Sequence, residues 1–145
     1  MTDERKIQVS LAVIRISTAM FFLVWSLRKI IQPESTQGIF SKFYYLEVSP
    51  VFSYVAGTIQ TLIVLAFLIG LFKTWTYGAI LGMHIVSVLS TYKQLFNPYE
   101  TPNTLFWAAV PALGGLIALF LLRDKDEFLT VKMGRAVSSD KRVDS

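Results

Sequence analysis

The chain has 145 residues, of which 53% are hydrophobic and only 17% are charged, and its formal net charge is +4. A soluble domain typically carries about a quarter charged residues, so the composition favours a small integral membrane protein with one domain. The absence of cysteine excludes a disulfide framework, a thiol redox pair and a cysteine-ligated metal or iron–sulfur centre. The positive charge is concentrated near the two ends, where it bears on membrane orientation and lipid headgroups rather than on nucleic acid.

The first predicted element is a long apolar helix at residues 7–31, preceded by a polar lead at residues 1–6. A helix rises about 1.5 Å per residue, so roughly 20 apolar residues cross a bilayer core of about 30 Å. The helix should end near Gln32-Pro33, because proline disfavours helix in the residue before it. The run is too long for the apolar part of a secretory signal, and we expect it to be retained as a membrane span.

The next segment, residues 34–49, is rich in aromatic side chains, among them Phe40, Phe43 and Tyr44. Apolar positions between residues 39 and 46 fall at helical spacing, which predicts a short amphipathic helix lying in the membrane interface. The alternative is a loop whose aromatic side chains anchor it at the level of the lipid headgroups.

Three further spans are predicted, at residues 50–72, 75–95 and 104–122. Ser49-Pro50 supplies an N-cap and a proline at the first helical position of the second span. A very short turn at Lys73-Thr74 makes the second and third spans an antiparallel hairpin. Pro111 should kink the last span. The fold class is therefore all-α, a four-helix bundle that spans the membrane in several passes.

The remaining residues, 123–145, form a charged tail that we expect to be disordered after about Gly134. Four spans place both termini on one side of the membrane. That side carries nine lysines and arginines outside the spans, and the other side carries four. The positive-inside rule then places both termini and the tail in the cytoplasm, and the protein in a cell inner membrane.

Arg15 lies inside the first span, where a charge costs at least ~2.5 kcal/mol near the centre of the bilayer. No aspartate or glutamate lies within any of the four spans, so the sequence predicts no acidic partner at its depth. The rise per residue places His84 at nearly the same depth and Gln60 roughly one turn deeper. Thr18 shares the helical stripe of Arg15, and Ser87 shares the face of His84. We therefore expect an inward-facing pocket whose donors suit a ligand carbonyl or anion.

Each member of this cluster also has a purely structural interpretation. Arg15 could extend along the helix to the cytoplasmic headgroups. Gln60 could serve only to hold helices together, a contact worth about 0.6 kcal/mol on average. His84 could be an ordinary interhelical histidine. One histidine and no cysteine do not support a metal or haem site.

Two stretches of the sequence resemble a known family of small membrane proteins. The chain is similar to the DoxX-like family and its MauE-type relatives over roughly residues 9–122. The similarity is carried by Arg15, by the stretch FLVWSLRKIIQP, which contains Lys29, and by the stretch VAGTIQTLIVLAFLIGLF, which contains Gly70. The resemblance implies a bacterial inner-membrane bundle of four helices. It matches Arg15 to the family's first-helix arginine, Lys29 to the lysine that closes that helix, and Gly70 to the glycine that closes the second helix.

Two positions depart from the family pattern. Ser26 stands where a glycine is usual, and Gln60 stands where many members carry a glutamate. The second departure argues against proton-coupled chemistry at this position and against an ion pair with Arg15. The cysteine chemistry of MauE-type proteins cannot operate in a chain without cysteine.

The function expected from these observations is that of an accessory membrane protein, not an enzyme by itself. The cluster would hold a small lipophilic ligand such as a quinone, or a partner helix, among membrane lipids. The first alternative is a membrane subunit of a quinone-linked oxidoreductase, with Arg15 on a quinone carbonyl, His84 supplying a proton and a partner subunit carrying the redox centre. The second alternative is a small transporter that acts as a homo-oligomer.

Overall fold

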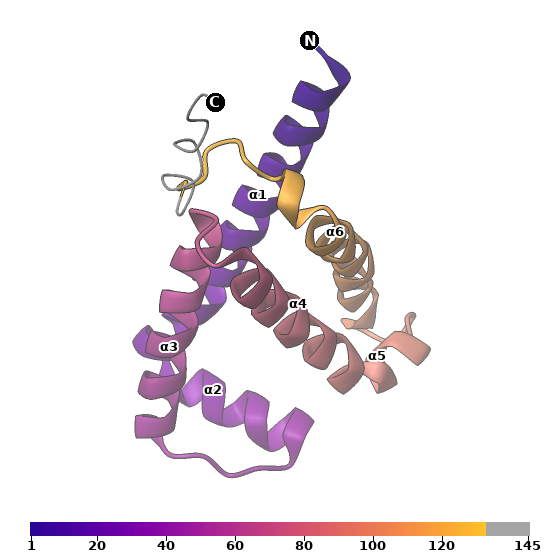
Figure 1. The fold of residues 1–145 in the computed structure, drawn as a ribbon. Coiled ribbons are helices and arrows are strands. Elements are labelled where there is room, and N and C mark those ends of the chain that lie inside the picture. The colour runs from indigo at the N-terminus through magenta and orange to yellow at the C-terminus, as the bar shows by residue number, and fades with distance from the viewer. Residues whose placement is uncertain (133–145) are drawn as a thin grey trace, which may run out of the picture.

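The computed structural model describes residues 1–132, and its regular elements in that range are all helical (Figure 1). In chain order they are α1 (Asp3–Ile31), α2 (Pro33–Ile39), the π-helical turn η1 (Phe40–Tyr44), α3 (Pro50–Leu68), α4 (Lys73–Ser90), α5 (Tyr92–Phe96), the 3-10 helix η2 (Asn103–Ala108), α6 (Ala109–Leu121) and the 3-10 turn η3 (Arg123–Lys125). The predicted all-α class is confirmed for this part of the chain.

Three helical stretches in the described range are long and apolar enough to cross a membrane, namely Asp3–Ile31, Pro50–Leu68 and Asn103–Leu121. The first, second and fourth predicted spans correspond to them. The third predicted span, residues 75–95, is divided in the structure between α4 and the short α5. The four-helix membrane bundle stays a prediction.

Local sequence signals explain where the helices begin. Thr2 caps α1 by accepting a hydrogen bond from the Arg5 amide at 3.2 Å, so α1 starts at Asp3 rather than at residue 7. Ser49 accepts from the Phe52 amide at 3.3 Å, which confirms the predicted N-cap of α3. Pro50 occupies the first position of α3, where its missing amide is not needed.

The turn between α3 and α4 differs from the prediction. α3 ends at Leu68, and the chain reverses through Gly70, which has a φ of +71°, and Phe72, which has a φ of +48°. Lys73 and Thr74 therefore belong to α4 and do not form the turn. The reason is that glycine adopts the left-handed conformation without the steric cost that a Cβ imposes, so the reversal occurs where the glycine stands.

α1 and α3 lie side by side along much of their length, and α4 and α6 form a second pair (Figure 1). The first pair approaches closely at Gly57, where an added Cβ would lie 2.9 Å from Cβ of Lys29 and 3.0 Å from the carbonyl oxygen of Ser26. The Ser53 hydroxyl donates to the Lys29 carbonyl oxygen at 2.6 Å across the same contact. The main apolar core lies nearer the other end of the pairs and consists of Leu11, Ala19, Phe22, Val64, Phe67, Tyr77, Ile80, Leu116 and Leu119.

Segment 34–49 is helical as far as Tyr44, which agrees in part with the short helix expected between residues 39 and 46, because Tyr45 adopts a left-handed conformation with a φ of +55° and ends the helix. α2 turns away from the end of α1, and after η1 a loop leads the chain back to the start of α3 (Figure 1). Aromatic contacts fix this region, with the Phe40 ring 5.1 Å from that of Phe52 and the Phe43 ring 6.4 Å from that of Phe106. These contacts join the two helix pairs at this end, and an interfacial position in the membrane stays a prediction.

The last predicted span, residues 104–122, is divided into η2 and α6 at Ala108–Ala109. Pro111 falls in the first turn of α6, where its lack of an amide removes no α-helical hydrogen bond. After η3 the chain turns back across α1 towards the end of α3 (Figure 1). The prediction of disorder after Gly134 lies outside the described residues.

Candidate functional site

Arg15 is fully buried in the structure, with 0% of its surface exposed. It lies on α1 beside the end of α3, where its Nε donates a hydrogen bond to the carbonyl oxygen of Leu68 at 3.0 Å. Leu68 is the last residue of α3, whose 19 residues span about 28 Å. That length is close to the thickness of a bilayer core. Arg15 is therefore level with the end of a membrane-length helix and not with its middle.

The guanidinium of Arg15 forms an ion pair with the carboxylate of Asp126, and both side chains are fully buried. Its Nη2 donates to the carbonyl oxygens of Phe128 at 2.8 Å and Leu129 at 3.2 Å. With Leu68 these contacts supply four acceptors to a group that has five N–H donors. The charge is thus compensated within the protein.

The expectation that Arg15 has no acidic partner at its depth is wrong. The predicted spans contain no acidic residue, but Asp126 lies only five residues beyond the end of α6 at Leu121. The chain folds back after η3 and brings this carboxylate to the level of Arg15. The signal that could have identified it is the short distance in sequence between the last span and an acidic residue, combined with an arginine near the same end of the first span.

Asp126 has two further contacts that account for its own burial. The Tyr77 hydroxyl donates to its second carboxylate oxygen at 2.6 Å. The Lys73 amine donates to its backbone carbonyl oxygen. A buried carboxylate is tolerated when it is both paired and hydrogen-bonded, and here α1 and α4 supply the partners.

We name residues 126–131 the strap, because they run from the Asp126 ion pair along the α3–α4 turn. The Val131 amide donates to the Ile69 carbonyl oxygen at 2.9 Å. Gly70 leaves room for Thr130, whose Cγ2 would lie 2.6 Å from an added Cβ. The guanidinium of Arg5 lies 4.1 Å from the centre of the Phe128 ring. The strap therefore joins the start of α1, the end of α3 and the start of α4.

The other predicted site residues lie elsewhere. His84 is buried beside α6, where its Nε2 is 2.9 Å from the carbonyl oxygen of Ala109, and its ring contacts Phe22 edge to face. Gln60 and Thr18 are half-buried and Ser87 is exposed. None of these four hydrogen-bonds to Arg15. The structure brings Arg15 together with Asp126, Tyr77 and Lys73 instead.

The family-matched positions Lys29 and Gly70 both lie at close backbone contacts. The Lys29 carbonyl accepts from Ser53 where α1 meets α3, and Gly70 forms the left-handed turn against the strap. Both roles are structural in the described chain.

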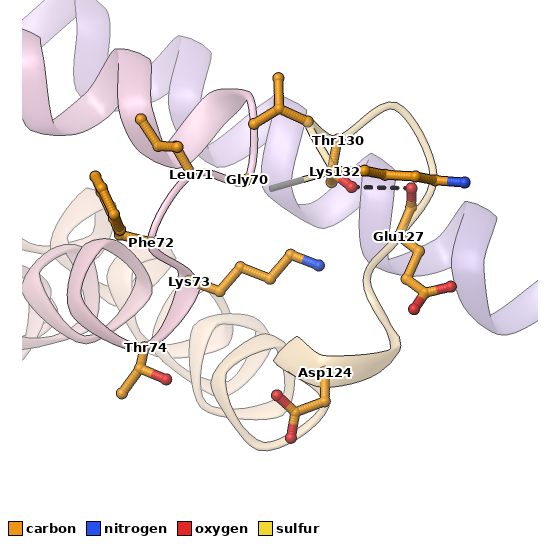
Figure 2. A pocket seen from close by; sticks show the side chains of 10 residues that line it. Gly70, Leu71, Phe72, Lys73, Thr74, Asp124, Glu127, Thr130 and Lys132 are labelled. Atoms are coloured by element: carbon orange, nitrogen blue, oxygen red, sulfur yellow. Dashed lines mark hydrogen bonds between the residues drawn. The ribbon is translucent and has the colours of Figure 1, made fainter. Parts of the chain in front are cut away.

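A surface hollow of about 790 Å³ lies between the α3–α4 turn and the strap (Figure 2). The side chain of Lys73 extends into it from the start of α4, with Asp124 and Glu127 on the opposite wall and Phe72 on the near wall (Figure 2). Within residues 1–132, no three histidine, aspartate or glutamate side chains are grouped so that they could hold a metal ion. The hollow offers mixed charge beside an apolar rim.

Comparisons with models of protein families, with characterised proteins and with solved structures find no match to the chain. The resemblance to the DoxX-like family stays a prediction.

Proposed function

We propose that the chain is a multi-pass inner-membrane protein with four spans, and that it acts as an accessory subunit that binds a partner helix. The three apolar stretches that could cross a membrane support this assignment. Their outer surfaces carry large exposed apolar side chains: Met20, Val24 and Ile31 on α1, Val55, Ile59 and Leu62 on α3, and Ile117 and Leu121 on α6. Such surfaces need lipid or another apolar helix beside them.

The distribution of charge supports a cytoplasmic position for the strap end. Arg5, Lys73 and Lys132 lie on or near the strap, whereas Lys42 and Lys93 lie on the segments at the opposite end. In this orientation the ion pair of Arg15 lies at the inner boundary of the hydrocarbon layer, where α3 ends.

The partner-helix form of the proposal is favoured over a neutral ligand, such as a quinone, held by Arg15. A ligand carbonyl needs a free donor, but Asp126 and three backbone carbonyls occupy four of the five donors of Arg15. By contrast, only 11% of the apolar window in Asn103–Leu121 is buried, against 28% in α1 and 22% in α3. The observation that carries the proposal is this poorly covered last helix, which has the surface to pack against a second protein.

Site-specific photo-crosslinking in native membranes tests the proposal. A photoreactive residue at Ile117 of α6 should link the chain to a second polypeptide, whereas one at Ile59 of α3 should label lipid. Both positions are apolar and exposed, with 43% and 54% of their surfaces accessible, so they form a matched pair. Labelling of lipid alone at both sites would contradict a partner on α6. Turnover of quinone by the purified chain alone would contradict an accessory role.

Release of the chain from membranes by alkaline carbonate would contradict membrane integration itself. An integral protein stays in the pellet because its apolar spans remain in the bilayer. This simple fractionation comes before the crosslinking experiment.

A further inference from the structure

The strap is held mainly by polar contacts. Asp126 is fully buried, whereas Leu129 and Val131 expose 64% and 43% of their surfaces. Leu129 also has a φ of +56°, a left-handed conformation that is uncommon for residues other than glycine because it brings Cβ close to the following carbonyl oxygen. Phe128 is half-buried, with the Arg5 guanidinium 4.1 Å from its ring centre. Because no apolar side chain of the strap is fully buried, its position depends largely on the ion pair and the hydrogen bonds.

These polar contacts converge on one anion. The guanidinium of Arg15 and the hydroxyl of Tyr77 both donate to the carboxylate of Asp126. Arginine binds phosphate as readily as carboxylate, because its planar donors suit both groups. In effect, Arg15 and Tyr77 form an anion receptor that the chain fills with its own aspartate.

We propose that the strap is a reversible closure over this receptor, and that the phosphodiester group of an anionic phospholipid competes with Asp126 for Arg15 and Tyr77. The inference rests on the proposed membrane location, which places the receptor at the level of the inner-leaflet headgroups. The hollow beside the strap supplies the approach, and Lys73 extends into it as a second cation (Figure 2). Its apolar rim, formed by Leu71 and Phe72, lies where an acyl chain would leave the headgroup.

Opening would separate two contacts on the α3 side. The Val131 amide would leave the Ile69 carbonyl oxygen, and Thr130 would move away from Gly70. Thr130 therefore reports the state of the strap, because its side chain packs on the turn only when the strap is closed. The absence of native cysteine allows one introduced thiol to be observed without background.

The experiment measures how fast a water-soluble maleimide labels the Thr130→Cys variant of the full chain in vesicles. In phosphatidylcholine vesicles the strap should stay closed and labelling should be slow. Vesicles that also contain phosphatidylglycerol should raise the rate several-fold. Ser10→Cys, at an exposed position of α1, is the matched control and should show no increase.

Two further measurements distinguish displacement of the strap by a lipid from other causes of faster labelling. Asp126→Asn in the Thr130→Cys background should label rapidly in phosphatidylcholine alone, because the strap has lost its charge. Inorganic phosphate at equal ionic strength should leave the rate of Thr130→Cys unchanged, and a rise equal to that with phosphatidylglycerol would overturn the lipid as the competitor. A rate that is the same in both vesicle types while Asp126→Asn accelerates labelling would show a fixed structural segment and overturn the proposal. Carbonate release of the chain would instead overturn the membrane assignment, so the two failures are distinguishable.

Discussion

Replacing Asp126 by leucine should be among the most destabilising single changes in the described chain. The change leaves the fully buried Arg15 without its counter-ion, and breaking a buried pair in this way typically costs about 3–5 kcal/mol. Arg15→Leu should cost a similar amount, because it strands the Asp126 carboxylate and removes the donor from the Leu68 carbonyl. The double variant should cost less than the sum of the two by about 1–3 kcal/mol, since neither charge is then left alone.

The free energy of unfolding can be measured by titrating the protein in mixed micelles with sodium dodecyl sulfate and following tryptophan fluorescence. The exposed pair of Lys6 with Asp3 is the matched control, because its atoms are 3.1 Å apart but its side chains are 63% and 94% accessible. Asp3→Asn should change the stability by less than about 0.5 kcal/mol. Equal small effects for Asp3→Asn and Asp126→Leu would refute the reasoning, and so would strictly additive effects of the Arg15 and Asp126 variants.

Three further substitutions test single contacts in the same unfolding assay. Gly57→Ala should separate α1 from α3 and destabilise the fold by roughly 1–3 kcal/mol. Gly82→Ala is the control and should be neutral or stabilising, because no atom lies within 4 Å of the added Cβ. Equal effects of the two substitutions would contradict the close approach at Gly57. Tyr77→Phe removes a hydroxyl that donates to a charged group, so a loss of about 1.5–3 kcal/mol is expected, and no loss would show that Asp126 does not need this donor. Gly70→Ala should cost at least about 1 kcal/mol from its left-handed backbone alone, and a neutral result would mean that the α3–α4 turn differs from the one described.

The helical class and most helix positions could be predicted from the sequence, because they depend on local signals. Ser49-Pro50 marks the start of α3 in both the prediction and the structure. The error at the α3–α4 turn arose from treating Gly70 as part of a continuing apolar run, although glycine is the residue that reverses a chain most easily. Hydropathy alone does not reveal a helix end at a glycine inside an apolar stretch. The conformational preference of glycine must be considered as well.

The burial of Arg15 was expected, but its partner could not be found by comparing depths within spans. Asp126 is separated from Arg15 by 111 residues and belongs to a polar segment that periodicity assigns to the tail. Its position depends on the reversal of the chain after η3, which is fixed by tertiary contacts and not by local sequence. Similar depth does not establish contact either. His84 was predicted to lie at nearly the depth of Arg15, but its Nε2 lies within hydrogen-bond distance of the carbonyl oxygen of Ala109 in α6.

The burial of Arg15 depends on the strap lying against the end of α3, and a cysteine pair tests this position most directly. Ile69 and Val131 are joined by a backbone hydrogen bond of 2.9 Å, and both side chains are partly accessible. In the chain, which has no native cysteine, the variant Ile69→Cys/Val131→Cys should form an intramolecular disulfide in membranes with a mild permeant oxidant. Leu62→Cys/Val131→Cys, with the first thiol about 10 Å further along α3, should not. A disulfide in the first pair alone is the predicted result, and the absence of a disulfide in the first pair would contradict the strap and the burial of Arg15 beneath it.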